Sequence, residues 1–326
     1  MTNNQNKIAF ITIYFGNIPD YLNLFLDSAS KNPSYDFIVF SDWGNLPDYG
    51  DNIFFIKISL EEFNQKAISK GILRNPIKNT YKLCDLKPAW IHILDDIELL
   101  NKYEFIGYVD IDMIFGRIDH FIDYNRLSNL DLWSISNVLI SGAFTIYKNS
   151  EKMKMLYRKA DCWQQVFDYP ESLAFDETLH TCTMKSLNGV ELISFTDLVY
   201  KEKDNGLKIF QEDNIIYEWY YKTIKYKNGV LTDLDGKEYI SYHYVKVKKH
   251  LLWYYPKWKH LPNSFYINRY GYSNKFLGPL NILKIVLTPP YFYNAIAKIK
   301  PYIPRLFHHI LHTKMQSVIT TIKDKL

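Results

Sequence analysis

Two acidic residues, Asp110 and Asp112, stand one residue apart at the point where the apolar run over residues 105–109 ends. An ionised carboxylate is costly to remove from water, so two acids at the tip of a buried strand need a cation or hydrogen-bond donors. A divalent metal ion that carries a diphosphate would satisfy both carboxylates. We therefore interpret the pair as a metal or nucleotide site, and acids that cap or form salt bridges are the structural alternative.

Asp233 and Asp235 have the same spacing in a different setting. They stand in a polar stretch rich in turn-forming residues, between residues 227–229 and Lys237. This setting predicts the tip of a β-hairpin. The spacing alone is therefore a weak signal, and the apolar strand before Asp110 is what distinguishes the first pair.

The hydrophobic pattern before and after Asp110 alternates between strands and helices. Its β-branched and aromatic runs predict strands over 7–15, 36–40, 53–58, 105–111, 131–136 and 142–147. Its amphipathic runs predict helices over 19–32, 60–70, 81–100, 150–167 with Ser150 as the capping residue, and 175–187. This alternation indicates an α/β fold with a mostly parallel sheet.

Three of the predicted strands end in polar or aromatic residues. In open α/β sheets, ligands bind beyond the carboxyl ends of the strands. We expect Tyr14 and Phe15, which precede Gly16, to offer an aromatic face to a nucleotide base. Asp42 would accept hydrogen bonds from the base or ribose, and Asp110 would lie near metal-bound phosphates. Ordinary strand-end turns are the alternative for the first two positions.

The net charge of +4 conceals two regions of opposite sign. Residues 243–326 hold 14 Lys and Arg against one acid, which gives +13, and residues 1–242 hold 25 basic and 34 acidic residues, which gives −9. Basic residues interleaved with Trp and Tyr suit an anionic membrane surface. The acidic body would repel nucleic acid, so we expect no nucleic-acid partner. A helical subdomain with solvated basic side chains is the alternative.

The cysteines and the amino terminus indicate the cellular compartment in which we expect the protein. Cys84, Cys162 and Cys182 are an odd number at wide spacing, without metal-ligand register, and predict reduced core thiols. Residues 8–15 are too short and too strand-like for a secretion signal. We expect a cytoplasmic protein that binds peripherally to the inner face of the cytoplasmic membrane.

Five short motifs occur in a fixed order along residues 7–243. They are YKLCDLKP at 81–88, GYVDID at 107–112, SGAF at 141–144, FDET at 175–178 and YH at 242–243. This succession resembles metal-dependent nucleotide-sugar glycosyltransferases of the GT-A fold, above all bacterial enzymes of capsule and lipopolysaccharide synthesis. The resemblance implies a GT-A-like, Rossmann-like catalytic domain over 1–242, with helices flanking the sheet, and a basic, aromatic-rich, mainly helical segment over 243–326.

The same resemblance implies a metal site and a phosphate site. Asp110 would face the ribose and the metal, and Asp112 would ligate Mn²⁺ or Mg²⁺ with His243 as a further ligand. Lys87 would neutralise the departing diphosphate, and the backbone at Gly142, after Ser141, would approach the donor sugar. The structural alternatives are a half-buried strand residue for His243, a solvated Lys87 and a strand-entry turn at Gly142.

Asp176 and Glu177 form the remaining acidic pair. If the enzyme inverts configuration, one of them takes the proton of the acceptor hydroxyl. If it retains configuration, they more plausibly hold sugar hydroxyls. An acid pair that stabilises the amino terminus of the predicted 175–187 helix is the structural alternative.

These inferences predict a glycosyltransferase that moves a sugar from a nucleotide-sugar, with UDP as the best candidate carrier, to a glycan or lipid-linked acceptor. Two other classes compete with it. One is a non-enzymatic membrane-binding protein built around residues 243–326. The other is a two-metal phosphohydrolase, for which only a weak run of Asp119, His120 and Asp123 is available near Asp110.

Overall fold

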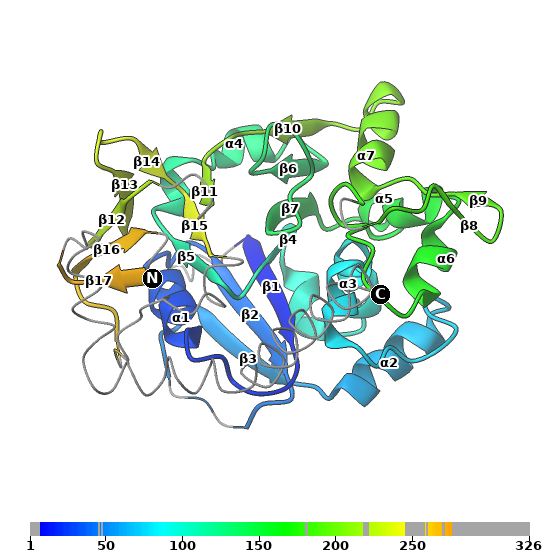
Figure 1. The fold of residues 1–326 in the computed structure, drawn as a ribbon, viewed down its shortest axis with the longest axis horizontal. Helices are drawn as coiled ribbons and strands as arrows, with labels where there is room; N and C mark the ends of the chain where they lie inside the picture. The colour runs from blue at the N-terminus through cyan, green and yellow to red at the C-terminus, as the bar shows by residue number, and fades with distance from the viewer. Residues whose placement is uncertain are drawn as a thin grey trace, which may run out of the picture.

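The structure, a computed structural model, describes residues 7–44, 46, 48–179, 182–217, 222–244, 258, 260–268 and 271–275. A seven-stranded sheet in the order β10-β6-β7-β4-β1-β2-β3 forms its centre (Figure 1). The strands are β1 (Ile8–Tyr14), β2 (Asp36–Ser41), β3 (Ile53–Lys57), β4 (Phe105–Val109), β6 (Leu132–Ser134), β7 (Phe144–Lys148) and β10 (Ile209–Gln211). Only β7 runs antiparallel to its neighbours, so the predicted α/β fold with a mostly parallel sheet is confirmed.

Helices cover both faces of this sheet (Figure 1). The α-helices are α1 (Leu22–Ser30), α2 (Leu60–Ser69), α3 (Trp90–Ile93), α4 (Tyr124–Leu127), α5 (Glu151–Lys154), α6 (Trp163–Asp168) and α7 (Phe195–Asp204). The 3₁₀ helices are η1 (Thr80–Cys84), η2 (Lys87–Ala89), η3 (Glu98–Lys102), η4 (Ile118–His120) and η5 (Leu156–Lys159). The predicted helices over 19–32 and 60–70 are confirmed as α1 and α2.

The two faces arise from the period-two alternation of the strands. In β1, Ala9 and Ile11 face a core that includes residues of α2, α3, α6 and α7. The intervening Ile8 and Phe10 face a second core with α1 and α4. Because both faces are covered, β1 and β2 are almost continuously buried and apolar, as expected for central parallel strands.

Two smaller sheets extend the molecule beside α1. β11 (Ile215–Tyr217), β15 (Ser241–His243) and β5 (Met113–Phe115) form one of them. β14 (Glu238–Tyr239), β13 (Val230–Asp233), β12 (Ile224–Lys227), β16 (Ser264–Asn268) and β17 (Gly271–Ser273) form the other. The turn between β13 and β14 holds Asp233, Asp235 and Gly236, whose φ is 88°, so the predicted hairpin tip is confirmed.

The predicted helix over 81–100 is wrong. The segment forms η1, η2, α3 and η3 instead. Pro88 lacks the N–H that a continuous helix needs at this point. In addition, Lys82 and Lys87 turn inward to the buried carboxylates of Asp85 and Asp176, which an amphipathic helix with a solvated charged face would not allow.

The two later helix predictions are also wrong. Residues 150–167 divide into α5, η5 and α6, because Ala160 is extended at ψ 115°, and Ser150 stands at the N-cap position without a side-chain capping bond. Residues 175–178 form a turn, and Ala174 and Leu179 on either side take left-handed backbone angles, which a helix excludes. Farther along, Ser186–Leu187 is a strand, β8, paired with β9 (Val190–Glu191).

The basic segment over 243–326 is described only in part. Its strand β16 pairs with β12, and β17 pairs with β16, so the described part is β-structure rather than the predicted helix. Residues 276–326 lie outside the described residues, as do residues 245–257, and the predicted membrane-docking surface lies there. In the described part of the chain, no helix is both long and apolar enough to cross a membrane.

Candidate active site

A cavity of about 370 Å³ opens at the carboxyl ends of β1 and β4. Three parts of the chain line it: the end of β1 with Tyr21, the segment over 79–90, and the Asp110–Asp112 turn with His243. Its lining residues are Thr12, Ile13, Tyr14, Phe15, Tyr21, Asn79, Thr80, Tyr81, Leu83, Cys84, Lys87, Trp90, Asp110, Ile111, Asp112 and His243. The cavity therefore lies where an open α/β sheet binds its ligands.

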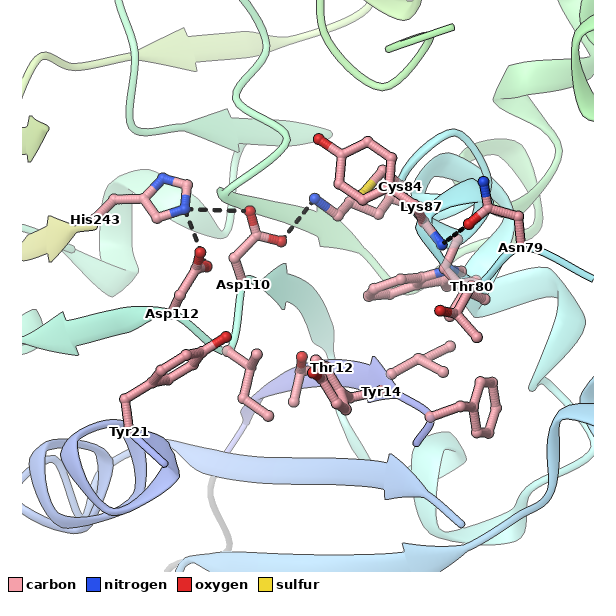
Figure 2. Close-up of a pocket in the computed structure, with 16 residues that line it drawn as sticks. Thr12, Tyr14, Tyr21, Asn79, Thr80, Cys84, Lys87, Asp110, Asp112 and His243 are labelled. Carbon is pink, nitrogen blue, oxygen red and sulfur yellow. Dashed lines mark hydrogen bonds and ion pairs between the residues drawn. The ribbon is translucent and has the colours of Figure 1, made fainter. Parts of the chain in front are cut away.

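Asp110, Asp112 and His243 converge at one end of the cavity (Figure 2). One ligand atom of each lies within 4.8 Å of the others. The Nε2 atom of His243 is 3.1 Å from Oδ1 of Asp112 and 3.5 Å from Oδ2 of Asp110. Among the described residues, this trio is the one group of three metal-ligating side chains found.

Strand pairing brings the trio together across 131 residues of sequence. β15 lies antiparallel to β5, with His243 opposite Met113. The N–H of Asp110 donates to the carbonyl of Ala143 and fixes the start of the turn, at 3.1 Å. The N–H of Tyr244 donates to the carbonyl of Asp112 at 3.2 Å. The turn is thus held by backbone bonds, and both Asp110 and Asp112 line the cavity.

The donor chemistry of the trio fits a divalent cation. Two carboxylates and an imidazole nitrogen suit Mn²⁺, and two carboxylates suit Mg²⁺. The side chain of Asp110 is 26% exposed, so a ligand that enters the cavity can reach it. The geometry of the cavity is therefore compatible with Asp110, Asp112 and His243 as metal ligands.

Lys87 lies beside the trio and is almost fully buried. Its Nζ is 2.7 Å from Oδ1 of Asp110 and 3.3 Å from Oδ2 of Asp176. It also donates to the carbonyl of Gly142 at 2.6 Å. Burial alone would lower the pKa of Lys87, but the carboxylates of Asp110 and Asp176, together with Cys84, raise it well above its ordinary value. Lys87 is therefore a fixed positive charge at the cavity wall, not a solvated surface residue.

Asp176 and Glu177 contact this centre from the protein interior. Burial raises the pKa of Asp176 well above its ordinary value, and Lys87 opposes that shift. Oε1 of Glu177 accepts the N–H of Gly142 at 3.0 Å. Neither acid is among the residues that line the cavity. Since residues 175–178 form a turn, the alternative that the two acids stabilise a helix terminus is wrong.

Gly142 is required by the close approach of these acids. A Cβ atom at this position would lie 2.2 Å from Oδ2 of Asp176 and 2.9 Å from Cγ of Glu177. Any side chain would displace Asp176 from Lys87. Gly142 is not among the residues that line the cavity, and its close neighbours are these two carboxylates. The approach of its backbone to a donor sugar stays a prediction.

The predicted nucleotide residues divide into two groups. Tyr14 and Phe15 line the cavity, and Tyr14 packs against Trp43 with ring centroids 5.4 Å apart. Gly16 and Asp42 are not among the lining residues. Instead, both carboxylate oxygens of Asp42 accept the N–H of Gly16, at 3.0 and 3.2 Å. The strand-end turn considered for Asp42 therefore exists.

The sequence reasoning assigned no role to several residues of the cavity wall: Thr12, Tyr21, Asn79, Thr80, Tyr81, Cys84 and Trp90. Tyr81 and Cys84 fall inside the YKLCDLKP motif, so that motif was the available signal. Burial raises the pKa of the Cys84 thiol, which keeps it protonated and unreactive. Cys162 is buried and Cys182 is half-buried, and all three thiols are free.

The residues proposed for a two-metal phosphohydrolase lie elsewhere. Asp119 accepts the hydroxyl of Ser34 at 3.0 Å, and Asp123 accepts the N–H of Asn125 at the start of α4. None of Asp119, His120 and Asp123 lines the cavity. This geometry offers no second metal position beside Asp110 within the described residues.

The family model of a family of unknown function, DUF6625, matches residues 10–274, so the chain belongs to that family. No curated protein matches the sequence.

Among solved structures, a crystal structure of an active-site mutant of LgtC aligns with a TM-score of 0.34 and 12% identity, over 66% of this chain and 76% of that one. The galactosyltransferase LgtC in complex with donor and acceptor sugar analogues aligns with a TM-score of 0.33 and 12% identity, over the same shares. At these values neither alignment carries an argument about this chain.

Proposed function

We propose that this protein is a metal-dependent glycosyltransferase that transfers a sugar from a nucleotide-sugar, with UDP as the preferred carrier, to a glycan or lipid-linked acceptor of bacterial surface polysaccharide. One observation carries the proposal. A trio of metal-ligating side chains and a buried lysine share one cavity at the carboxyl ends of parallel strands. A nucleoside diphosphate bound to a divalent cation is complementary to this combination of charges.

The departing diphosphate is the group that the site would stabilise. A bound Mn²⁺ or Mg²⁺ on Asp110, Asp112 and His243 would supply Lewis-acid stabilisation of the phosphate oxygens. Lys87 adds a positive charge beside Asp110 that is already desolvated and held in place. A preorganised charge of this kind acts on the charge that develops as the glycosidic bond breaks. In a water-poor cavity, this interaction favours the transition state over the intact donor.

Two aromatic residues at the end of β1 would receive the base. Tyr14 is half-buried, packs against Trp43 and lines the cavity. Phe15 lines the cavity beside it. Stacking of a base on a braced aromatic ring needs little reorganisation. Asp42 supports this wall through the Gly16 turn rather than through contact with the ribose.

Asp176 and Glu177 act on this site through Lys87 and Gly142. Asp176 holds Lys87 from the side opposite Asp110, and Glu177 fixes the backbone at Gly142. We propose that Asp176 is a positioning residue for Lys87. Removal of its carboxylate would leave Lys87 with Asp110 as its only ion-pair partner among the described residues.

Calorimetric titration with UDP-, GDP- and CMP-sugars, each with and without Mn²⁺, tests the function. We expect one nucleotide to bind in a metal-dependent manner to the wild type and to lose that binding in Asp112→Ala. Asp235→Ala is the matched control, because it removes an acid from the second Asp-x-Asp. If no sugar nucleotide binds the folded wild type with metal present, the proposal is wrong.

We further propose that the protein acts at the inner face of the cytoplasmic membrane, where its acceptor is lipid-linked. The basis is the charge of +13 over residues 243–326, which favours anionic lipid. Co-sedimentation of the full chain with vesicles of phosphatidylglycerol and phosphatidylcholine, compared with phosphatidylcholine alone, tests this step. Equal binding to both vesicles, or none at low salt, would contradict it without affecting the assignment of the active site.

A further inference from the structure

Tyr81 is an exposed aromatic residue at the mouth of the cavity. Its side chain is 62% exposed although it lines the cavity. The exposed large hydrophobic residues in the described part of the chain are Ile18, Ile68, Tyr81, Val138 and Leu234. Only Tyr81 among these five lines the cavity. A single exposed hydrophobic residue is ordinary on a protein surface, so what distinguishes Tyr81 is its place on the wall of the cavity that holds Lys87 and Asp110.

The exposure of Tyr81 does not come from a loosely held backbone. Oδ1 of Asn79 accepts the N–H of Tyr81 at 3.0 Å and caps η1. The next residue, Lys82, is fully buried and forms an ion pair with Asp85 at 2.7 Å. Leu83 is buried in the core. The ring therefore projects into solvent from a backbone that is anchored on both sides.

Tyr81 also lies within electrostatic reach of the phosphate site. Desolvation of its hydroxyl, together with Cys84, Asp110 and Asp176, raises the pKa of Tyr81. Asn79 and Thr80, which precede it on the same wall, are exposed and polar. The wall thus combines one aromatic face with an amide and a hydroxyl group.

This wall is separate from the aromatic wall at the end of β1. Figure 2 shows Tyr14 and Thr12 on one side of the cavity and Asn79 and Thr80 on the other. Asp110 separates these four residues from His243. A sugar nucleotide has two ring systems, one on each side of its diphosphate. The cavity offers two walls that carry aromatic residues, and the labelled residues of both walls lie on the side of Asp110 away from His243. Tyr14 and Phe15 account for the base, which leaves the Asn79–Tyr81 wall for the second ring.

We propose that Asn79, Thr80 and Tyr81 form the subsite for the pyranose ring of the donor, with Tyr81 as its stacking platform. The inference rests on the proposed function and specifies which part of the donor each wall contacts. A pyranose has an apolar face of C–H groups and a rim of hydroxyls. The Tyr81 ring matches the face, and the Asn79 amide and Thr80 hydroxyl match the rim.

Binding of UDP and of UDP-hexoses in the presence of Mn²⁺ tests the subsite. The probes are UDP, UDP-glucose, UDP-galactose and UDP-N-acetylglucosamine, titrated into the wild type, Tyr81→Ala and Tyr81→Phe. We expect Tyr81→Ala to weaken the best UDP-hexose by about 3- to 10-fold, a typical loss for one aromatic contact, and to leave UDP within about twofold. Tyr81→Phe should bind as the wild type does, because it retains the ring.

Each other outcome has a definite meaning. An equal loss for UDP and UDP-hexose would place Tyr81 on the nucleotide and overturn the inference. No loss in Tyr81→Ala, or an equal loss in Tyr81→Phe, would overturn the stacking role. If the wild type binds neither UDP nor any UDP-hexose with Mn²⁺ while it stays folded, UDP as the carrier and this subsite for UDP-hexoses are wrong, and the function itself fails if no GDP- or CMP-sugar binds either. Leu234→Ala is the matched control, since it removes an exposed hydrophobic side chain that does not line the cavity.

Discussion

Two lysine–aspartate pairs, both involving the segment over 80–90, have the same separation and different surroundings. Lys82 and Asp85 are 2.7 Å apart, and so are Lys87 and Asp110. Distance alone therefore does not distinguish them. The difference lies in what the remaining atoms of each pair face.

The first pair is closed on all sides. Lys82 donates also to the carbonyls of Val166 and Glu171, at 2.6 and 2.9 Å. Asp85 accepts the N–H groups of Leu173 and Phe175 and the hydroxyl of Ser172. Both side chains are at most 1% exposed. This pair joins η1 to the loop that carries Asp176, and it leaves no atom for a ligand.

The second pair is open on one side. Oδ1 of Asp110 meets Lys87, whereas Oδ2 faces His243 at 3.5 Å. The Lys87 side chain is 4% exposed and that of Asp110 is 26% exposed. Thus one carboxylate connects a fixed positive charge with a candidate metal position. The comparison teaches that a functional ion pair is recognised by an oxygen that faces another candidate ligand and by its access to a cavity.

The closed pair should dominate stability. Lys82→Met removes the cation and leaves the Asp85 carboxylate buried, which typically costs about 3–5 kcal/mol of unfolding free energy. Urea denaturation followed by circular dichroism measures the loss. Lys87→Met is the matched comparison and should cost less, because water reaches Asp110 and the raised pKa of Asp176 favours its neutral form. An equal loss of unfolding free energy in the two variants would contradict the distinction between a closed and an open pair.

The metal trio, which shares Asp110 with the open pair, should dominate ligand binding. Asp112→Asn removes one carboxylate of the metal trio and should reduce Mn²⁺ affinity by at least about 100-fold, since an amide is a poorer ligand for a hard cation than a carboxylate. The unfolding free energy should change by about 0.5–3 kcal/mol, the usual range of a point substitution, because the side chain of Asp112 is only 11% exposed and lies 3.1 Å from His243. Manganese titration measured by calorimetry, with urea denaturation alongside, checks both statements. Unchanged Mn²⁺ binding would mean that the trio is structural.

The sequence predicted the central sheet well because burial on two faces leaves a strong signal. β1, β2 and β4 are short apolar runs that end at polar residues. The ends of β1 and β4 line the cavity as expected, whereas Asp42 after β2 does not. The Asp110 turn was found because an acid pair after an apolar strand needs a partner, whereas His243 was expected only from the family resemblance. The three side chains do lie together, and their role as metal ligands stays a prediction. Local patterns were sufficient wherever neighbouring residues decide the structure.

The sequence failed where distant contacts decide the structure. Lys82 and Lys87 fit a solvated helix face in the sequence, yet both are buried against acids that the local pattern cannot identify as partners. The turn at 175–178 depends on Asp85, which takes the N–H groups of Leu173 and Phe175. By contrast, Ser194 and Asp197 form a capping box at α7, a local signal for a helix start that the prediction overlooked.

Lys87 should couple the metal to the diphosphate. Before a diphosphate binds, Lys87 neutralises the Asp110 carboxylate. Mn²⁺ alone therefore binds to a carboxylate whose charge is already compensated, next to a positive charge. A diphosphate that takes over the charge of Lys87 leaves Asp110 to the metal. We therefore expect UDP to raise Mn²⁺ affinity in the wild type by a factor within the usual coupling range of about 5–150.

Lys87→Gln should reduce the factor by which UDP raises the affinity for Mn²⁺, because the binding of each ligand changes. Mn²⁺ alone should bind more tightly than to the wild type, and UDP should bind less tightly, in a calorimetric cycle of the two ligands. Lys87→Arg should retain the coupling, and Lys31→Gln controls for loss of an exposed charge on the surface. A coupling factor that is the same in the wild type and Lys87→Gln would show that Asp110 is equally available to the metal with and without Lys87.

The second Asp-x-Asp should show the smallest effects on ligand binding, because its acids are used by the hairpin. Asp233 accepts the N–H groups of Asp235 and Lys237 and pairs with Lys222 at 2.9 Å. Burial alone would raise the pKa of Asp233, but Lys222 and the N–H of Lys237 lower it below its ordinary value. Its contribution to stability is therefore complete above the unfolded-state pKa of about 3.9 and is lost as the pH falls through the lower folded-state pKa.

Asp233→Ala should thus reduce the unfolding free energy at pH 7 by about 1–2 kcal/mol, the usual cost of leaving a capping set unpaired. Asp235→Ala, in which only an exposed carboxylate is lost, should change it by less than about 0.5 kcal/mol. Neither substitution should alter Mn²⁺ affinity, measured in the same titration as for Asp112→Asn. If Asp235→Ala weakened Mn²⁺ binding as much as Asp112→Asn does, the spacing of the acids, and not the strand that precedes them, would determine where the metal binds.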